Sequence, residues 1–349
     1  VQDDAVHTGH DVAYLNDNLN RLIDAEEGTW GGSSISSRTR HQIWTLNQTG
    51  NWELDKLDLD GDDNFNESGE LNDDRTHNVV NELVGRDTDD SGSDNYTLAY
   101  DAAGNMTDDD AAYTFEWDAF YRLRKVRNSS NSALVSEYWY NGLGYLVTRH
   151  QDTDTDGDVD GSDVKFHTAY DERWRQVATF RGSDANPKEQ FVYHCAGDGG
   201  WGGRSYIDTV LLRDRDMTNG WTGAADGTLE ERTYYLQNWR ADVVVIVDDT
   251  GEIQESVRYS AYGVPLGLPK GDADADGDCD ADDFAIVNSW VSTPSYNVCG
   301  DFNLDGVLDV KDETIATDND GAVHGRGVLS DIDFGNRKGY AGYEGDAKL

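Results

Sequence analysis

Positively charged residues are scarce in this chain. Lys and Arg number 28 against 69 Asp and Glu, so the 349 residues carry a formal net charge of −41. A surface this acidic repels phosphate, and we therefore expect no nucleic acid partner and no binding to an anionic membrane surface. The chain also lacks an apolar run of about 18 residues, which predicts that there is no membrane insertion. Its first residues, Val1–Asp4, show no signal peptide, which favours a mature or cleaved chain.

Cysteine is rare as well. Cys195, Cys279 and Cys299 form no Cys-x-x-Cys pair, so no zinc motif is present. Cys279 and Cys299 lie at corresponding places beside two acidic segments. They are expected either to form a disulfide in an oxidising compartment or to remain two buried thiols. Cys195 is expected to be a single buried thiol.

Motifs of catalysis are missing too. The 8 histidines show no His-Glu-x-x-His pattern, and there is no Gly-x-Ser-x-Gly nucleophile turn. Carboxylates are so frequent that no pair is distinguished as an acid–base couple. The glycine-rich stretch 197–203 lacks the lysine of a phosphate-binding loop and is interpreted as an exposed loop. We therefore expect that the protein is not an enzyme.

Aromatic residues are plentiful, in contrast. A hydrophobic content of 37% combined with high charge would be typical of a disordered chain. The 18 Tyr, 10 Trp and 9 Phe argue against disorder, because disordered chains are poor in aromatic residues. The chain should fold, although its carboxylates repel one another.

Three acidic segments, 152–163, 272–283 and 301–312, share one spacing. Each has oxygen-bearing side chains at positions 1, 3, 5, 9 and 12 and glycine at position 6. Ca²⁺ takes six to eight oxygen ligands, and a loop with alternate acidic side chains supplies them, with a backbone carbonyl at position 7. Glycine permits the sharp turn. The alternative is a solvated Asp-rich turn. The predicted metal-ligating residues are Asp152, Asp154, Asp156, Asp158, Asp160, Asp163, Asp272, Asp274, Asp276, Asp278, Asp280, Asp283, Asp301, Asn303, Asp305, Val307, Asp309 and Asp312.

A fourth acidic segment, 58–70, fits the calcium spacing only in part. Glycine is missing from its position 6, and the acidic residue that would close the loop falls one place late. Metal binding and a plain acidic turn are weighed equally there. The candidate ligands are Asp58, Asp60, Asp62, Asn64 and Asn66.

A short pattern recurs through the first half of the chain. Its anchor is an Asp or Asn that follows an aromatic or other residue. A basic or polar residue stands four places after the anchor, and an apolar residue usually stands five places after it. The anchors are Asp17, Asn47, Asn78, Asp101, Asp118, Asn141 and Asp171. Alternation in 113–117 and 137–140 predicts strands, and Asn141-Gly142 predicts a turn. Each repeat is therefore predicted to be a β-hairpin, and stacked hairpins would bury a continuous aromatic layer.

The repeats at 100–107 and 117–123 resemble the YD repeats of the RHS family. Segments 235–245, 258–263 and 338–344 are similar to that family's C-terminal core, and 271–313 resembles a dockerin module. The resemblance implies a mainly β fold of stacked YD/RHS-type hairpins over 1–268, with acidic inserts at 58–70 and 152–163. A dockerin-like pair of calcium loops would occupy 271–320, with helices at about 281–290 and 310–317. Residues 321–349 would return to the RHS core.

These observations favour an extracellular or cell-surface structural protein stabilised by calcium. Weak, repeated calcium loops suit the millimolar calcium outside cells. Unpaired strand edges would let copies associate head to tail into filaments or a surface layer. One alternative is a binding module, which uses the dockerin-like pair or an aromatic β surface for a cohesin-like surface protein or a glycan. A second is a fragment of an RHS toxin-delivery shell.

Overall fold

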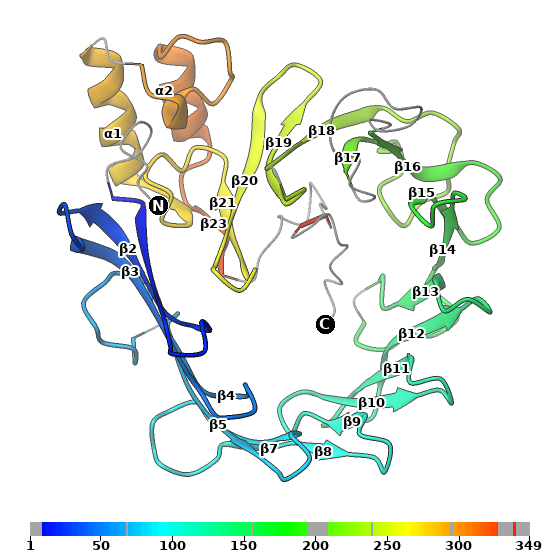
Figure 1. Ribbon diagram of the computed structural model, residues 1–349. Coiled ribbons are helices and arrows are strands. Elements are labelled where there is room, and N and C mark those ends of the chain that lie inside the picture. Colours follow the sequence, from blue (N-terminus) through cyan, green and yellow to red (C-terminus); the bar gives the residue numbers. More distant parts are fainter. Residues whose placement is uncertain are drawn as a thin grey trace. The chain divides into compact units, whose positions relative to one another are not determined.

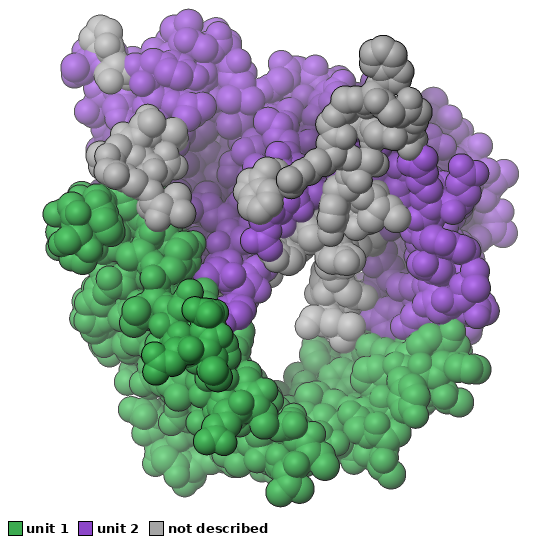
Figure 2. All heavy atoms as spheres, in the orientation of Figure 1, with its two compact units in different colours: residues 1–137, 156–159 green, residues 138–155, 160–349 purple. Residues whose placement is uncertain are grey.

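The chain forms two compact units of antiparallel sheet in a computed structural model. The structure describes residues 9–67, 69–154, 156–194, 209–238, 240–293, 296–326 and 338–339. One unit comprises residues up to Glu137 together with Asp156–Val159, and the other comprises the remainder (Figure 2). The boundary falls inside strand β12 (Leu134–Tyr140). The predicted mainly β fold class is confirmed, whereas the domain boundaries drawn from the sequence stay a prediction.

The first unit contains two runs of strands in which each strand pairs with the next in antiparallel fashion. Strands β1 to β7 form one sheet in sequence order, and β8 to β11 follow in the same manner (Figure 1). The strands are β1 (Asp11–Asn16), β2 (Leu22–Trp30), β3 (Ile35–Leu46), β4 (Trp52–Asp58), β5 (Leu71–His77), β6 (Leu83–Asp87), β7 (Tyr96–Thr97), β8 (Ala99–Tyr100), β9 (Met106–Asp108), β10 (Tyr113–Trp117) and β11 (Leu123–Asn128).

The second unit continues the meander from β13 to β21 and adds two helices. Strand β24 pairs with β21 after the helices, so the chain returns to the sheet within the described residues. The elements are β13 (Leu146–Gln151), β14 (Lys165–Tyr170), β15 (Gln176–Arg181), β16 (Pro187–Tyr193), β17 (Val210–Arg215), β18 (Glu231–Gln237), β19 (Val243–Asp248), β20 (Ile253–Tyr259), β21 (Pro265–Pro269), β22 (Asp278–Cys279), α1 (Ala281–Ser292), η2 (Val298–Gly300), α2 (Val310–Asp318), β23 (Ala322–Val323) and β24 (Gly325–Arg326).

All seven predicted anchors occupy the first position of a five-residue turn. At Asp17, the carboxylate accepts hydrogen bonds from the backbone N–H groups of Leu19 and Arg21. The same contacts to the second and fourth following residues recur at the other six anchors, and also at Asn238 and Asp248. A side chain that satisfies the turn's own donors specifies the hairpin locally, which explains why sequence alone located these turns.

The fourth residue of each of these turns has a positive φ, which favours glycine. Tyr121 adopts this conformation at φ 60° with its side chain 64% exposed, so it gains little packing in return for the backbone strain. We expect Tyr121→Gly to raise the free energy of unfolding by about 0.5–1 kcal/mol in urea titrations. In the matched variant Ala119→Gly the backbone needs no positive φ, and stability should fall. Equal losses in both variants would contradict the explanation.

The apolar core is divided into small clusters. In the second unit, one cluster lies on the sheet and a second joins the helices to the loops that precede them. The sheet cluster is Phe191, Val210, Tyr235, Val243 and Ile246. The helical cluster has Ala273, Val287, Phe302 and Ala316 at its centre. Because Ala273 and Phe302 each follow the first Asp of an acidic loop, packing fixes both loops relative to α1 and α2.

Candidate metal centres

Within each unit, the predicted calcium loops lie at the same ends of the strands. Successive connections of an antiparallel meander alternate between the two ends of its strands. In the first unit, the five-residue turns that begin with Asp or Asn contact one another at one end. Loop 58–70 joins β4 to β5 at the opposite end.

In the second unit, loop 152–163 joins β13 to β14, and the helical segment follows β21. Both lie at the strand ends opposite to the turn after β14 and the turn between β20 and β21.

The first Asp of a loop accepts hydrogen bonds from backbone N–H groups within its loop. Both oxygens are used, and the donors come from positions 4 to 6, which curls the chain around the carboxylate. The donors are Gly61 and Asp63 to Asp58, Ala275 and Gly277 to Asp272, and Asp305 and Gly306 to Asp301. This curl turns the next alternate side chains toward the same point.

The last acidic residue of each loop closes it with a second pair of backbone hydrogen bonds. One oxygen accepts from position 2, and the other accepts from position 9. Asp283 does so with Ala273 and Asp280, Asp312 with Phe302 and Asp309, and Asp163 with Thr153 and Asp160. The three loops therefore have the same hydrogen-bonded frame.

Loop 58–70 reaches the same frame with a longer closing residue. Glu70, one place later than the usual closing position, accepts from the N–H groups of Leu59 and Glu67. The extra side-chain carbon of Glu lets its carboxylate reach these N–H groups from a position one residue later in the loop. The closing acidic residue that the sequence placed one position late therefore does close this loop.

Several groups of acidic and histidine side chains lie close enough together to share one ion, and they include three carboxylate sets of the predicted loops. In each set, one oxygen per residue lies within 4.8 Å of the others. The sets are Asp58, Asp60 and Asp62; Asp152, Asp154 and Asp163; and Asp272, Asp274 and Asp276. In loop 272–283, Oδ1 of Asp278 is buried without a hydrogen-bond partner among the described residues. An unsatisfied buried carboxylate oxygen is costly, and a cation is one partner that would satisfy it.

The other predicted residues have backbone contacts of the same loops. Asp276, Asp156, Asp305 and Asp62 each accept from the N–H two residues on. Asn303 accepts from Asp305, Asn64 accepts from Asn66, and Asn66 accepts from the side chain of Asn72. Asp156 and Asp158 belong to the first compact unit, whereas Asp152, Asp154, Asp160 and Asp163 belong to the second.

Position 9 has a role that the sequence analysis missed. Asp280 and Asp309 are the N-cap residues of α1 and α2, and Asp283 and Asp312 complete a capping box with them. The predicted helices are confirmed, and the closing residues lie in the first helical turn as expected. The signal was in the sequence, because an Asp followed three places later by a second acidic residue precedes each helix.

A fifth loop, 87–95, was also missed. Asp87 is buried and accepts from the N–H groups of Ser91 and Gly92, as the first Asp of the other loops does. Asn95 closes it early by accepting from Thr88. Its Asp-x-Asp-x-Ser-Gly spacing was the available signal.

Burial and mutual repulsion raise carboxyl pKa values in loop 272–283. Burial, aided by the charge of Asp283, raises the pKa of Asp272 to about 8. Burial and the charge of Asp276 raise the pKa of Asp274 to about 6. The pKa values of Asp283 and Asp312 are raised as well, chiefly by burial. Without a cation, the folded loop therefore holds protons at pH values where an unfolded chain has released them.

This gives a definite pH dependence in chelator. The folded pKa of Asp272 lies above its unfolded value of 3.8, so its contribution to stability is complete below 3.8 and is lost as pH rises toward 8. We expect the thermal midpoint in chelator to fall between pH 5 and pH 8. In calcium the trend should reverse, because the ion needs deprotonated ligands. Asp272→Asn should flatten the slope in chelator, and an unchanged slope would contradict this assignment.

Cys279 and Cys299 are not joined by a disulfide. Cys279 is buried, with its thiol 3.4 Å from the carbonyl oxygen of Ala316, and Cys299 is partly exposed. Of the alternative drawn from the sequence, two buried thiols, the structure therefore shows the burial for Cys279 alone. Cys195 and the stretch 197–203 lie outside the described residues.

Comparisons with known proteins return only remote likenesses. No protein-family model matches the chain. No curated protein matches it either. A solved structure of TcdB2-TccC3-TEV is 12% identical in sequence to this chain, with a TM-score of 0.39. The alignment covers 78% of this chain and 15% of the chain in that structure. For TcdB2-TccC3 the identity, the two covered shares and the TM-score are 10%, 78%, 16% and 0.33, and for the Tc holotoxin pore of Photorhabdus luminescens they are 9%, 78%, 17% and 0.27. The chain thus spans less than a fifth of each of these structures.

Within the described residues, no helix is both long and apolar enough to span a membrane.

Proposed function

We propose that the protein is an extracellular structural protein whose loops 58–70, 152–163, 272–283 and 301–312 bind Ca²⁺. The observation that carries this proposal is the shared frame of the loops, in which the closing carboxylate of each binds two backbone N–H groups in the same way. In loops 58–70, 152–163 and 272–283, carboxylates of the loop also lie within 4.8 Å of one another. All-oxygen donor sets suit Ca²⁺ rather than zinc.

Calcium would relieve a charge problem that the fold itself creates. The chain brings carboxylates within 4.8 Å of one another at several places, at a formal net charge of −41. A divalent cation at each loop offsets this repulsion and supplies the partner that Asp278 lacks among the described residues. Equilibrium dialysis with ⁴⁵Ca should give four bound ions per chain. Failure to detect saturable binding at millimolar calcium would contradict the proposal.

Self-association is the second part of the proposal. Strand β1 is an edge of its sheet among the described residues, and Tyr14 and Leu15 on it are 51% and 58% exposed. An edge strand with exposed apolar side chains can add a strand from another copy. Head-to-tail contacts of this kind produce filaments when the rotation does not close.

Electron microscopy tests this assembly. Negatively stained protein should form regular filaments or sheets in calcium and should lose them in excess chelator. Leu15→Lys should abolish them, whereas Val79→Lys, at a turn residue that is fully exposed, should not. Discrete particles in both conditions would overturn the polymer and favour a binding module.

The second candidate function is a binding module, which is favoured by exposed apolar side chains on the helical segment. Apolar side chains on the helical segment remain exposed, although the segment has its own buried cluster. They are Tyr296, Val298, Val307 and Val310. Isothermal titration with candidate surface proteins, with Val310→Lys as the disrupted form, distinguishes this function from self-assembly.

A further inference from the structure

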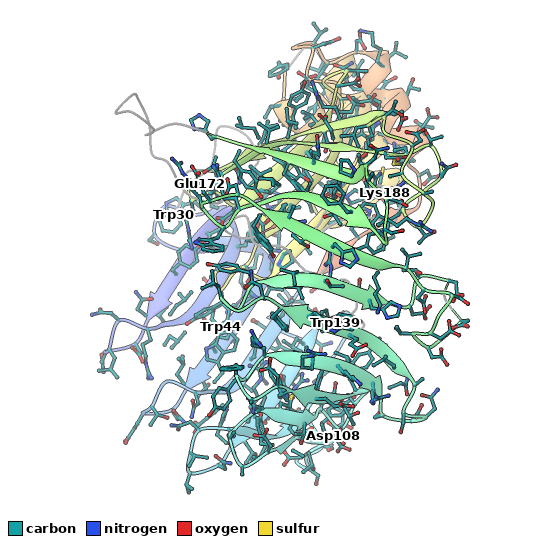
Figure 3. The ribbon with its side chains drawn as sticks, turned by 90° about the vertical axis from the view of Figure 1, so that its right-hand side faces the viewer. Trp30, Trp44, Asp108, Trp139, Glu172 and Lys188 are labelled. Carbon is teal, nitrogen blue, oxygen red and sulfur yellow. The ribbon has the colours of Figure 1, made fainter. Side chains whose placement is uncertain are left out.

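Lys188 and Asp216 form a fully buried pair in the second unit. Both side chains are 0% exposed, and Nζ of Lys188 lies 3.3 Å from Oδ1 of Asp216. Lys188 is the second residue of β16 (Figure 3), and Asp216 directly follows β17. The backbone N–H of Asp216 donates to the carbonyl of Lys188 at 2.9 Å. Neighbouring antiparallel strands therefore hold the two side chains against each other.

An ion pair is poorly supported at this place. An ammonium group has three N–H donors, and Nζ of Lys188 makes no hydrogen bond of normal geometry to any described residue. Burying a charge whose hydrogen bonds are not made is strongly unfavourable. Condensation of the two groups needs the neutral amine and the carboxylic acid, which is the pair that transfer of one proton from the ammonium to the carboxylate would give.

The carboxyl group of Asp216 is set up as an electrophile. Its Oδ1 accepts from the backbone N–H of Thr218 at 3.2 Å, and its Oδ2 accepts from the N–H of Asp226 at 3.0 Å. Backbone donors at both oxygens stabilise the negative charge that develops on the carboxyl group in a tetrahedral intermediate. Nζ of Lys188 lies 3.3 Å from Oδ1, which brings the amine to the carboxyl group whose Cγ it would attack, and burial of both side chains excludes bulk water.

We propose that Lys188 and Asp216 condense into an intramolecular isopeptide bond. The lone pair of the neutral Nζ attacks Cγ of the protonated Asp216, a C–N bond forms and the C–OH bond breaks. The hydroxyl leaves as water with a proton from the nitrogen, so one amide and one water replace one amine and one carboxylic acid. Nothing is oxidised or reduced, and no cofactor is needed. The bond joins β16 to the end of β17 and does not depend on calcium.

An exposed pair in the same chain is the matched control. Nζ of Lys311 lies closer to its Asp, 2.9 Å from Oδ2 of Asp305, but the two side chains are 63% and 36% exposed. When no ion is bound to the loop, water stabilises both charges there, so the amine stays protonated and unreactive. Proximity alone therefore does not select Lys188, whereas burial together with backbone activation of the acid does.

Mass spectrometry of the denatured full chain tests the proposal. The intact mass should be lower than the sequence mass by one water, and trypsin should yield a branched peptide that joins Lys188 to Asp216 instead of cutting after Lys188. Lys188→Arg and Asp216→Ala should restore the full mass. Asp216→Asn should form the same amide with loss of ammonia instead of water, and Lys311→Arg should keep the deficit. A full-mass wild-type chain with a free Lys188 would overturn the proposal.

Discussion

Chelation of calcium should unfold the helical segment 271–320 before the sheet. Two loops of this segment pack on one small cluster with α1 and α2, so the helices depend on the loops for their position. When the free calcium concentration is tenfold to a hundredfold above the dissociation constant of a site, binding at that site stabilises the fold by about 1.4–2.7 kcal/mol. Loss of two such sites is a large part of the stability of so small a core. Calorimetry in calcium and in chelator should show a lower, separate transition in chelator.

A pair of neighbouring variants separates the stability that bound calcium contributes from the effect of charge in general. Asp283 closes its loop, whereas Asp282 lies exposed beside it in the first turn of α1. Asp283→Asn should shrink the difference in stability between calcium and chelator by about 1–3 kcal/mol. Asp282→Asn should leave that difference intact. An equal effect of both variants would mean that general charge, and not a bound ion, stabilises the segment.

Features encoded within a few residues were the ones that sequence could predict. The Asx turn at Asp118 needs only its own five residues, so the hairpin array followed from the repeat. The helices are encoded locally as well, because Asp283 and Asp312 both close a loop and complete the capping box of the helix that begins there. Local hydrogen bonding thus determines both the strand order and the position of the helices.

Features that depend on strand register could not be predicted. Lys188 and Asp216 meet only because β16 pairs with β17 in one register, across a long connection that includes 195–208. Glu70 could be recognised as a closing residue only after its contacts to Leu59 and Glu67 were seen. In so acidic a chain, no sequence pattern separates a buried carboxylate from the many exposed ones.

Asp73→Ala should be among the most damaging substitutions in the first unit. The carboxylate of Asp73 is fully buried and accepts from Nε of Arg75 at 2.7 Å and from Nη2 of Arg86 at 3.0 Å. Arg75 also reaches Asp55 on the neighbouring strand. Removal of the central anion leaves two guanidinium groups partly buried without their main partner. We expect a loss of about 3 kcal/mol in the free energy of unfolding, measured in urea.

The matched control is Asp214→Ala. Asp214 also binds an arginine through two hydrogen bonds, to Arg232, but the arginine is 48% exposed. Solvent replaces the lost partner there, so the loss should be much smaller than that of Asp73→Ala. Asp73→Asn, which keeps the shape but not the charge, should fall between the two. Equal losses for Asp73→Ala and Asp214→Ala would show that burial does not set the strength of these pairs.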